Sequence, residues 1–201
     1  MPEPAEDETN LEAGETYDTE TFAGPVTGNA GTASFLDCHF DGADLSGLRA
    51  DRARFSHCHF TDVRASELRL VDASLLDSEL VDCRLGAVDA SGAELRRLRW
   101  TGGKVDFANF RTASMREVTF TGVEFGELDL LTARLKKVTF AGCRIGRLAL
   151  SGVELHDVDL SDAELLVVDG VGSLAGVTLS RDQVQLLAAA FAEHLGITVA
   201  D

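Results

Sequence analysis

The chain has 201 residues, of which 45% are hydrophobic and 26% are charged, and its formal net charge is −16. This length allows one domain with a sizeable core. The sequence contains no long apolar stretch and no basic leader followed by an apolar run, so it predicts neither a membrane span nor a secretory signal and favours the cytoplasm.

The beginning of the chain carries a strong excess of acid. Residues 1–20 contain no base and eight acids, namely Glu3, Glu6, Asp7, Glu8, Glu12, Glu15, Asp18 and Glu20. This composition is typical of a disordered segment, so the sequence predicts an acidic disordered tail over residues 1–20. A solubilising tail and a partner-binding arm both fit it, and its role is left open.

The next segment, residues 21–168, is dominated by a period of five. Every fifth residue from Phe35 to Leu165 is apolar and suited to face a core, and these residues form one register. A second register of mostly small apolar residues lies two positions earlier, from Ala33 to Ala163. No charged residue falls on either register. A helix repeats its buried face at 3.6 residues and a strand at 2, so a period of five requires a corner in every repeat. The position two after each large residue is Gly or Asp in 14 of 27 repeats, which suits a corner.

Stretches such as Ala43-Asp44-Leu45-Ser46-Gly47 and Ala163-Glu164-Leu165 resemble the pentapeptide-repeat family, and the resemblance covers residues 31–167. It implies an all-β fold, a right-handed quadrilateral β-helix with four repeats in each coil. We therefore expect about seven coils, with one set of outward side chains on each of four faces. Each face is named below after its first large inward residue: Phe35, Phe40, Leu45 or Ala50.

Side-chain sizes alternate across the interior that this fold implies. Phe40 would lie opposite Ala50, which balances their volumes. Trp100 would instead lie opposite Phe110, and Gly102 and Gly103 follow it, so a local bulge is expected there. A structural accommodation is the simpler explanation for this bulge, and a functional reason for it is left open.

Residues 169–201 follow a helical pattern instead. Ser180 and Gln183 form a capping-box pattern, and Gly196 suits a helix stop. One apolar stripe follows the helix: Val184, Leu187, Ala188, Phe191 and Leu195. This segment resembles the tails of actinobacterial quinolone-resistance pentapeptide-repeat proteins, which dimerise through such helices. We therefore expect it to cap the last coil and to form a homodimer interface.

Two Cys-His pairs resemble a metal-binding motif. Cys38-His39 and Cys58-His59 lie one coil apart and resemble zinc ligands, but the register turns the cysteines inward and the histidines outward. Stacked His39 and His59 leave a fortuitous surface metal site or a pH-sensitive contact as alternatives. No phosphate loop, nucleophile motif or pocket is evident, so the sequence predicts no cofactor, no metal site and no enzyme activity.

Outward charges are distributed unevenly. The Phe40 face has Arg99 as its only base and six acids: Asp41, Asp62, Glu79, Asp82, Asp159 and Asp162. The Phe35 face carries a basic block made of Arg96, Arg97, Arg116, Arg134, Lys136 and Lys137. The six acids are the predicted partner-binding surface.

The family resemblance implies a function for such an acidic rod. Well-studied members mimic DNA, bind DNA gyrase and protect it from inhibitors, without binding nucleic acid themselves. The alternative is a non-enzymatic protein-interaction scaffold unrelated to topoisomerases, for which outward-facing Phe107 would suit a contact. The sequence names neither the partner nor a drug or toxin.

Overall fold

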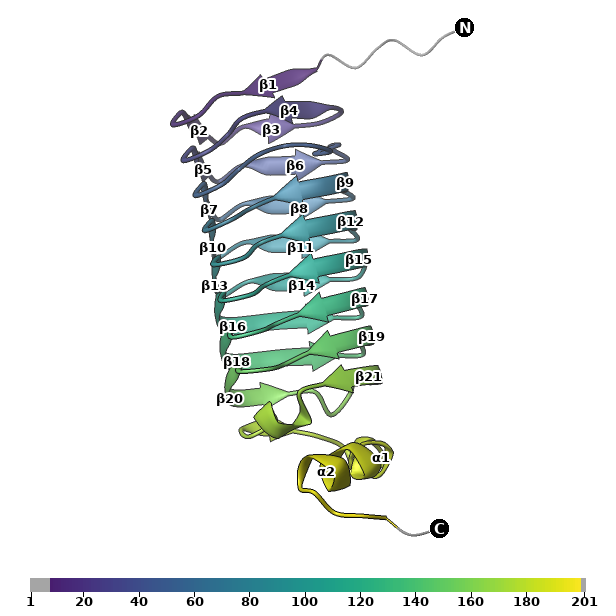
Figure 1. Cartoon of the computed structure of the whole chain (residues 1–201). Helices are drawn as coiled ribbons and strands as arrows, with labels where there is room; N and C mark the ends of the chain where they lie inside the picture. Colours follow the sequence, from purple (N-terminus) through teal and green to yellow (C-terminus); the bar gives the residue numbers. More distant parts are fainter. Residues whose placement is uncertain (1–7, 200–201) are drawn as a thin grey trace, which may run out of the picture.

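Parallel strands stacked one coil above another build the chain into a rod, seen in Figure 1. The computed structural model describes residues 8–199. On one face Phe35 pairs with Phe55, Phe55 with Leu75 and Leu75 with Leu95, and the ladder continues to Leu155. Four five-residue repeats therefore form each coil, and the fold is the expected right-handed quadrilateral β-helix, with about eight turns.

Regular strands lie on the Phe35, Phe40 and Leu45 faces, and the six-residue strands of the Leu45 face run across the corner onto the Ala50 face. The Phe35 face holds β2 (Thr16–Asp18), β5 (Ser34–Leu36), β7 (Arg54–Ser56), β10 (Ser74–Leu76) and β13 (Glu94–Arg96). The Phe40 face holds β3 (Thr21–Phe22), β6 (His39–Asp41), β8 (His59–Thr61), β11 (Glu79–Val81), β14 (Arg99–Thr101) and β22 (Val177–Thr178). Strands β16 (Ser114–Thr121), β18 (Arg134–Ala141) and β20 (Glu154–Asp159) run across the corner between these two faces. The Leu45 face holds β1 (Thr9–Leu11), β4 (Val26–Gly28), β9 (Arg64–Arg69), β12 (Arg84–Asp89), β15 (Lys104–Asn109), β17 (Glu124–Asp129), β19 (Arg144–Ala149) and β21 (Glu164–Asp169).

An additional first coil precedes the repeats that the sequence identified. Tyr17 pairs with Phe35, Phe22 with Phe40 and Thr9 with Val26, so this coil is slightly shorter than the regular ones. The predicted disordered tail is therefore wrong for residues 9–20. A shortened coil does not follow a strict period of five, so the periodic pattern missed it. Residues 1–7, with Glu3, Glu6 and Asp7, lie outside the described residues.

The core is a set of side-chain stacks along the rod axis. Phe35 and Phe55 stack with ring centroids 4.7 Å apart, Phe40 and Phe60 at 4.6 Å, and the first coil extends the second stack through Phe22. Nearly all residues of both registers are buried. Offset aromatic stacks add to the burial of apolar area, which accounts for a rod stabilised by contacts between neighbouring coils.

The predicted bulge at Trp100 is wrong. Trp100 pairs with Leu80 and Phe120 in the same register as the other coils, so no residue is inserted. The accommodation is confined to Gly103, whose φ of +82° would place a Cβ against the backbone oxygen of Cys83. Trp100 is buried, and its indole N–H has no hydrogen-bond partner within the described residues.

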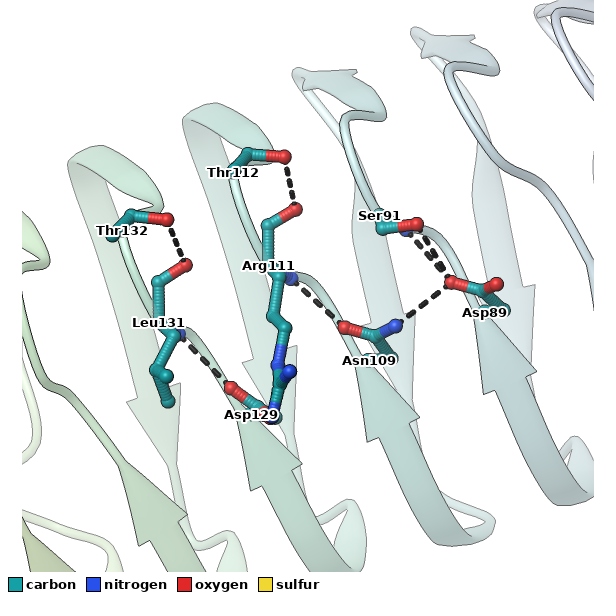
Figure 2. A network of polar contacts seen from close by, with 8 residues as sticks. All are labelled: Asp89, Ser91, Asn109, Arg111, Thr112, Asp129, Leu131 and Thr132. Carbon is teal, nitrogen blue, oxygen red and sulfur yellow. Dashed lines mark hydrogen bonds and ion pairs between the residues drawn. The ribbon is translucent and has the colours of Figure 1, made fainter.

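Polar side chains close one of the corners, as Figure 2 shows. Asp89, Asn109 and Asp129 occupy this corner in three successive coils, and each accepts a hydrogen bond from a backbone N–H a little later in the chain. The donors are Ser91 at 3.2 Å, Arg111 at 3.1 Å and Leu131 at 3.0 Å. These contacts satisfy amides that the turn leaves without a strand partner.

The C-terminal end is closed by the chain itself. After the short 3-10 helix η1 (Val171–Ser173), the helices α1 (Arg181–Leu186) and α2 (Ala188–His194) lie across the last coil (Figure 1). The capping box of Ser180 and Gln183 is present. The expected single helix is interrupted at Leu187, which has φ −87° and ψ −1° and is buried.

Candidate functional site: an acidic end and a divided acidic face

The six predicted partner-binding acids all lie on the outside of the rod, but not as one continuous surface. Asp41, Asp62, Asp82 and Asp162 are exposed, whereas Glu79 and Asp159 are half-buried. Asp62 and Asp82 occupy corners with φ of +52° and +53°, a conformation that Asp tolerates better than most residues. Oδ1 of Asp82 lies directly over Gly102 in the next coil, where a Cβ on that glycine would clash with it.

Glu79 differs from its neighbours because it is neutralised locally. Its carboxylate accepts a hydrogen bond of 2.9 Å from Nε of Arg99 and lies 3.6 Å from Nδ1 of His59. The Arg99 hydrogen bond holds the pKa of Glu79 below its usual value. A carboxylate already paired with a base on the next coil contributes little field to an approaching partner.

The carboxylate of Asp159 is hydrogen-bonded within its own turn. Its Oδ1 accepts hydrogen bonds from the backbone N–H of Ser161 at 2.9 Å and from the Ser161 hydroxyl at 2.6 Å. These bonds, the side-chain one first, lower the pKa of Asp159. The Asp159 carboxylate therefore stabilises the turn in addition to placing a negative charge on the surface.

An uncharged band separates the two groups of acids on the Phe40 face. Between Asp82 and Asp159 this face presents mainly threonine, glycine and alanine, apart from Arg99: Thr101, Gly102, Thr119, Thr121, Gly122, Thr139, Ala141 and Gly142. Asp162 lies four coils from Asp82, which is roughly 19 Å at the usual strand spacing. The predicted acidic face is thus divided into an N-terminal group, Asp41, Asp62 and Asp82, and a distant pair at the other end.

The strongest negative charge lies at the N-terminal end, and periodicity alone missed it. Residues 8–48, which form the first two coils, contain eight acids and no Lys or Arg: Glu8, Glu12, Glu15, Asp18, Glu20, Asp37, Asp41 and Asp44. None of these acids forms an ion pair with another described residue. Residues 49–199 contain 22 acids and 18 bases, so the rest of the rod is close to neutral. The position of Arg49 as the first base in the chain is a sequence signal that could have located this end.

The linear charge density of this end reaches that of nucleic acid. Eight net charges over two coils, about 10 Å of rod, give about one charge per 1.2 Å, and B-DNA has about one per 1.7 Å of axis. Over the remaining six coils the value is about one net charge per 7 Å. DNA-like charge is therefore a property of the N-terminal end and not of the whole rod.

The basic block is also partly neutralised. Arg97 forms a bidentate contact with Asp77, and Arg134 lies 3.3 Å from Glu154. Arg96, Arg116 and Lys136 form an in-register ladder on the Phe35 face. Arg96 lies 3.8 Å from Glu94, and Arg116 lies 3.8 Å from Glu117. Lys137 lies 3.9 Å from Glu117.

Several ion pairs between neighbouring coils join equivalent positions one coil apart, among them Asp77 with Arg97, Glu79 with Arg99, Arg134 with Glu154, and Arg144 with Glu164. Three other pairs join positions 18 or 22 residues apart, namely Arg69 with Asp51, Arg111 with Asp129, and Arg147 with Asp169. Counting charges face by face overlooked these pairs, although the coil length predicts those at equivalent positions. Most of the rod's charge is balanced along the stacking direction.

The cysteines and histidines are placed as the register predicted. All four cysteines are buried and free, and burial raises the pKa of Cys58 and Cys83 to about 11. His39 and His59 stack outside the rod with ring centroids 5.0 Å apart. Within residues 8–199 no three His, Cys, Asp or Glu side chains are grouped so that they could hold a metal ion.

The interior is filled by side chains apart from small apolar voids. Two voids of about 30 Å³ each lie along the axis, one near Phe55 and Leu70 and one beside Trp100 and Ala90. Their walls carry no polar surface, and their size is far below that of pockets for small-molecule ligands. No helix in the described part of the chain is long and apolar enough to cross a membrane.

The predicted dimer stripe is divided by the break at Leu187. Leu187 is buried and Phe191 is half-buried, whereas Val184, Ala188 and Leu195 remain exposed. Large exposed apolar residues are concentrated near this end: Leu166, Val167, Val184, Leu186, Leu195, Ile197 and Val199. Phe107, on β15, is 39% exposed.

Comparison with known proteins agrees with this architecture. Residues 33–110 match the family model described as pentapeptide repeat region, and no curated protein matches the sequence. A trypsin-treated variant of QnrB1, a plasmid-mediated fluoroquinolone resistance protein, is 21% identical over 96% of this chain and 100% of its own, with a TM-score of 0.41. HetL, a pentapeptide repeat protein involved in heterocyst differentiation regulation from the cyanobacterium Nostoc sp. strain PCC 7120, is 16% identical over 88% of this chain and 92% of its own, with a TM-score of 0.34.

At these identities and TM-scores, QnrB1 and HetL are similar proteins that give no information on what this chain binds. Residues 33–110 therefore form a pentapeptide-repeat region, and the same coil register continues through Leu165.

Proposed function

We propose that this protein acts without catalysis, by binding DNA gyrase or another type II topoisomerase in place of DNA and protecting it from inhibitors. The observation that carries the proposal is the DNA-like charge density of the first two coils. A surface that competes for a DNA-binding saddle needs a dense, phosphate-like field, and only this end of the rod supplies one. The sequence resemblance to gyrase-protecting members of the family favours the same partner.

In this proposal the contact surface is the N-terminal end together with the adjoining part of the Phe40 face. Asp41, Asp62 and Asp82 point outward and stand in for phosphates. Glu79 is less suited to this role because Arg99 already neutralises it. Asp159 and Asp162 would lie beyond the uncharged threonine band and contribute little to the same contact.

A homodimer through the C-terminal helices is the second part of the proposal. The exposed apolar residues at that end, among them Leu186 and Leu195, form the kind of patch that marks an interface. A two-fold dimer through this end would place the two acidic ends at opposite tips of a rod about twice as long. The proposal places the protein in the cytoplasm, where gyrase acts.

The test is a gyrase supercoiling assay with purified protein, with and without a fluoroquinolone, at two salt concentrations. We expect inhibition or drug rescue that weakens as salt rises, because phosphate-like contacts are screened. The triple variant Asp41→Lys, Asp62→Lys, Asp82→Lys should lose the effect, whereas the matched variant Asp159→Lys, Asp162→Lys should keep it. No effect at micromolar protein, or equal loss in both variants, would contradict the proposal.

A scaffold unrelated to topoisomerases is the second candidate. It is favoured by the ladder of Arg96, Arg116 and Lys136, because a cationic stripe repels a surface that binds DNA. A pull-down in which this ladder, and not the acidic end, is needed to retain a partner would favour the scaffold.

A further inference from the structure

The two ends of the rod differ in whether other parts of the described chain cover their last strands. At the C-terminal end the side chain of Gln183 bonds to two carbonyls of the last coil, and α1 and α2 lie over it. At the N-terminal end β1, β2 and β3 each pair on one side only, with β4, β5 and β6. β2 and β3 are the terminal strands of the main sheet, and no other described element lies beyond them (Figure 1). Within residues 8–199, this end is an open strand edge.

An open strand edge accepts another strand unless something opposes it, and proteins usually oppose it with charge. Here every charge on the edge coil is negative: Glu8, Glu12, Glu15, Asp18 and Glu20. The negative sign of this charge determines which kind of incoming strand is repelled. A second copy of this chain would bring the same five carboxylates against them, whereas a cationic segment would be attracted.

We propose that the N-terminal strand edge is a docking site for an extended, lysine- or arginine-rich segment of a partner protein, which adds as a strand to β2 or β3. The edge strands are short, with three residues in β2 and two in β3, so backbone hydrogen bonds alone hold a peptide weakly. The surrounding carboxylates supply the remaining attraction and the selectivity. Strand pairing adds what simple ion exchange lacks, a fixed direction and a requirement for free backbone N–H groups.

The inference goes beyond the proposed function, because it concerns any cationic partner and stands whether or not a topoisomerase is bound. Its test uses a labelled eight-residue peptide that alternates Lys with Thr and Val, titrated into the full chain and followed by fluorescence anisotropy. Three further peptides serve as comparisons: one N-methylated at alternate residues, one with Glu in place of Lys, and one with Lys and Gly that disfavours strands.

We expect the N-methylated peptide to bind at least about tenfold more weakly than the parent, and the Glu peptide not to bind. Hydrogen exchange with the bound parent peptide should slow at Thr16–Asp18 or Thr21–Phe22 and remain unchanged along the side faces. The variant Glu12→Gln, Glu15→Gln, Glu20→Gln should weaken binding about tenfold. The matched variant Glu67→Gln, Asp72→Asn, Glu124→Gln, which removes three exposed side-face charges, should not.

Equal binding of the N-methylated and parent peptides would overturn the proposal, since the site would then be an ion exchanger only. Protection that appears on β6 and β8 instead of the edge would also overturn it. So would hydrogen exchange in the peptide-free protein that is already slow at Thr16–Asp18 and Thr21–Phe22 and becomes faster on dilution, because the occupant would then be a second copy. The wild-type exchange experiment decides the matter even where the glutamine variant fails to fold.

Discussion

Gln183 donates a hydrogen bond of 2.7 Å from its side-chain amide to the carbonyl of Leu160, in the last regular coil. The same nitrogen donates to the carbonyl of Ala163 at 2.7 Å, and the amide oxygen accepts from the backbone N–H of Ser180. One buried side chain therefore completes both the helix cap and the last coil. It replaces the strand partners that a further coil would have provided.

Replacing Gln183 with Met should destabilise the fold by about 1–3 kcal/mol, because the carbonyl of Ala163 loses its donor while the side-chain volume is kept. The carbonyl of Leu160 still accepts from the backbone N–H of Ala163. Urea unfolding followed by circular dichroism measures the change. Gln185→Met, on the exposed side of the same helix, should have a free energy of unfolding close to that of the wild type. Equal values for the two variants would show that the amide does not close the coil.

Asp129 is the most deeply buried acid of the corner in Figure 2, with 1% of its surface exposed. It accepts from the N–H of Leu131 at 3.0 Å and from Nε of Arg111 at 2.7 Å. Asp129→Ala should cost about 1–3 kcal/mol, since a turn amide is left unsatisfied. Asp129→Asn should cost less, because its carbonyl still accepts from Leu131. Chemical denaturation of both variants measures the difference, and an alanine variant as stable as the asparagine variant would refute this ordering.

Leu186→Asp and Leu195→Asp should each convert the proposed homodimer into monomers. These side chains are 65% and 70% exposed and are not needed to cap the rod, so the substitutions leave the fold intact. Phe191→Asp is less informative, because this residue is already half-buried within one protomer. Size-exclusion chromatography with light scattering gives the mass, and Leu36→Asp at the far end is the control. A dimer that persists in both leucine variants would exclude this interface.

Stability should fall as the solution becomes more alkaline than about pH 9. Burial raises the pKa of Cys58 and Cys83 to about 11 from the ordinary value of 9.0. Below pH 9 both thiols are protonated in the folded and the unfolded chain, so their full contribution to stability is present and does not vary with pH. Between about 9 and 11 the unfolded chain releases protons that the folded chain retains, which costs up to about 1.4 kcal/mol per pH unit for each thiol.

The measurement is the free energy of unfolding at several pH values, for the wild type and for Cys58→Ala, Cys83→Ala. The double variant should show a shallower decline across this range, whatever its absolute stability. Parallel curves would mean that these thiols titrate normally in the folded protein. Thiol-reactive reagents should likewise label the folded wild type slowly at neutral pH.

The period-five pattern was enough to predict the β-helix, its inward residues and the direction of each outward residue, because a repeat without insertions leaves only one register. The first coil escaped the pattern. It is shorter than the regular coils, so Tyr17 and Phe22 stand where a strict count places Glu15 and Glu20. Composition therefore indicated disorder in a segment that two aromatic side chains hold in the core.

The surface was harder to predict than the core. The period of five predicts which residues point outward, but it does not say which side chain lies beside each of them on the next coil. Glu79 was therefore predicted to be an unpaired acid, although Arg99 pairs with it. The period also does not predict how deeply an outward residue is buried, since Asp129 lies at an outward position and is nonetheless buried. The break at Leu187 depends on how the helix meets the rod, which no local pattern specifies.

The constant coil length has a consequence for how such a protein changes in size. Duplicating one interior coil in the coding sequence would lengthen the rod while every other side chain kept its face, its neighbours and its ion pairs in the adjacent coils. An insertion of one, two or three whole repeats would instead move everything downstream of it onto other faces. The distance between the two ends is therefore free to vary in discrete steps, with the acidic end and the capped end preserved intact.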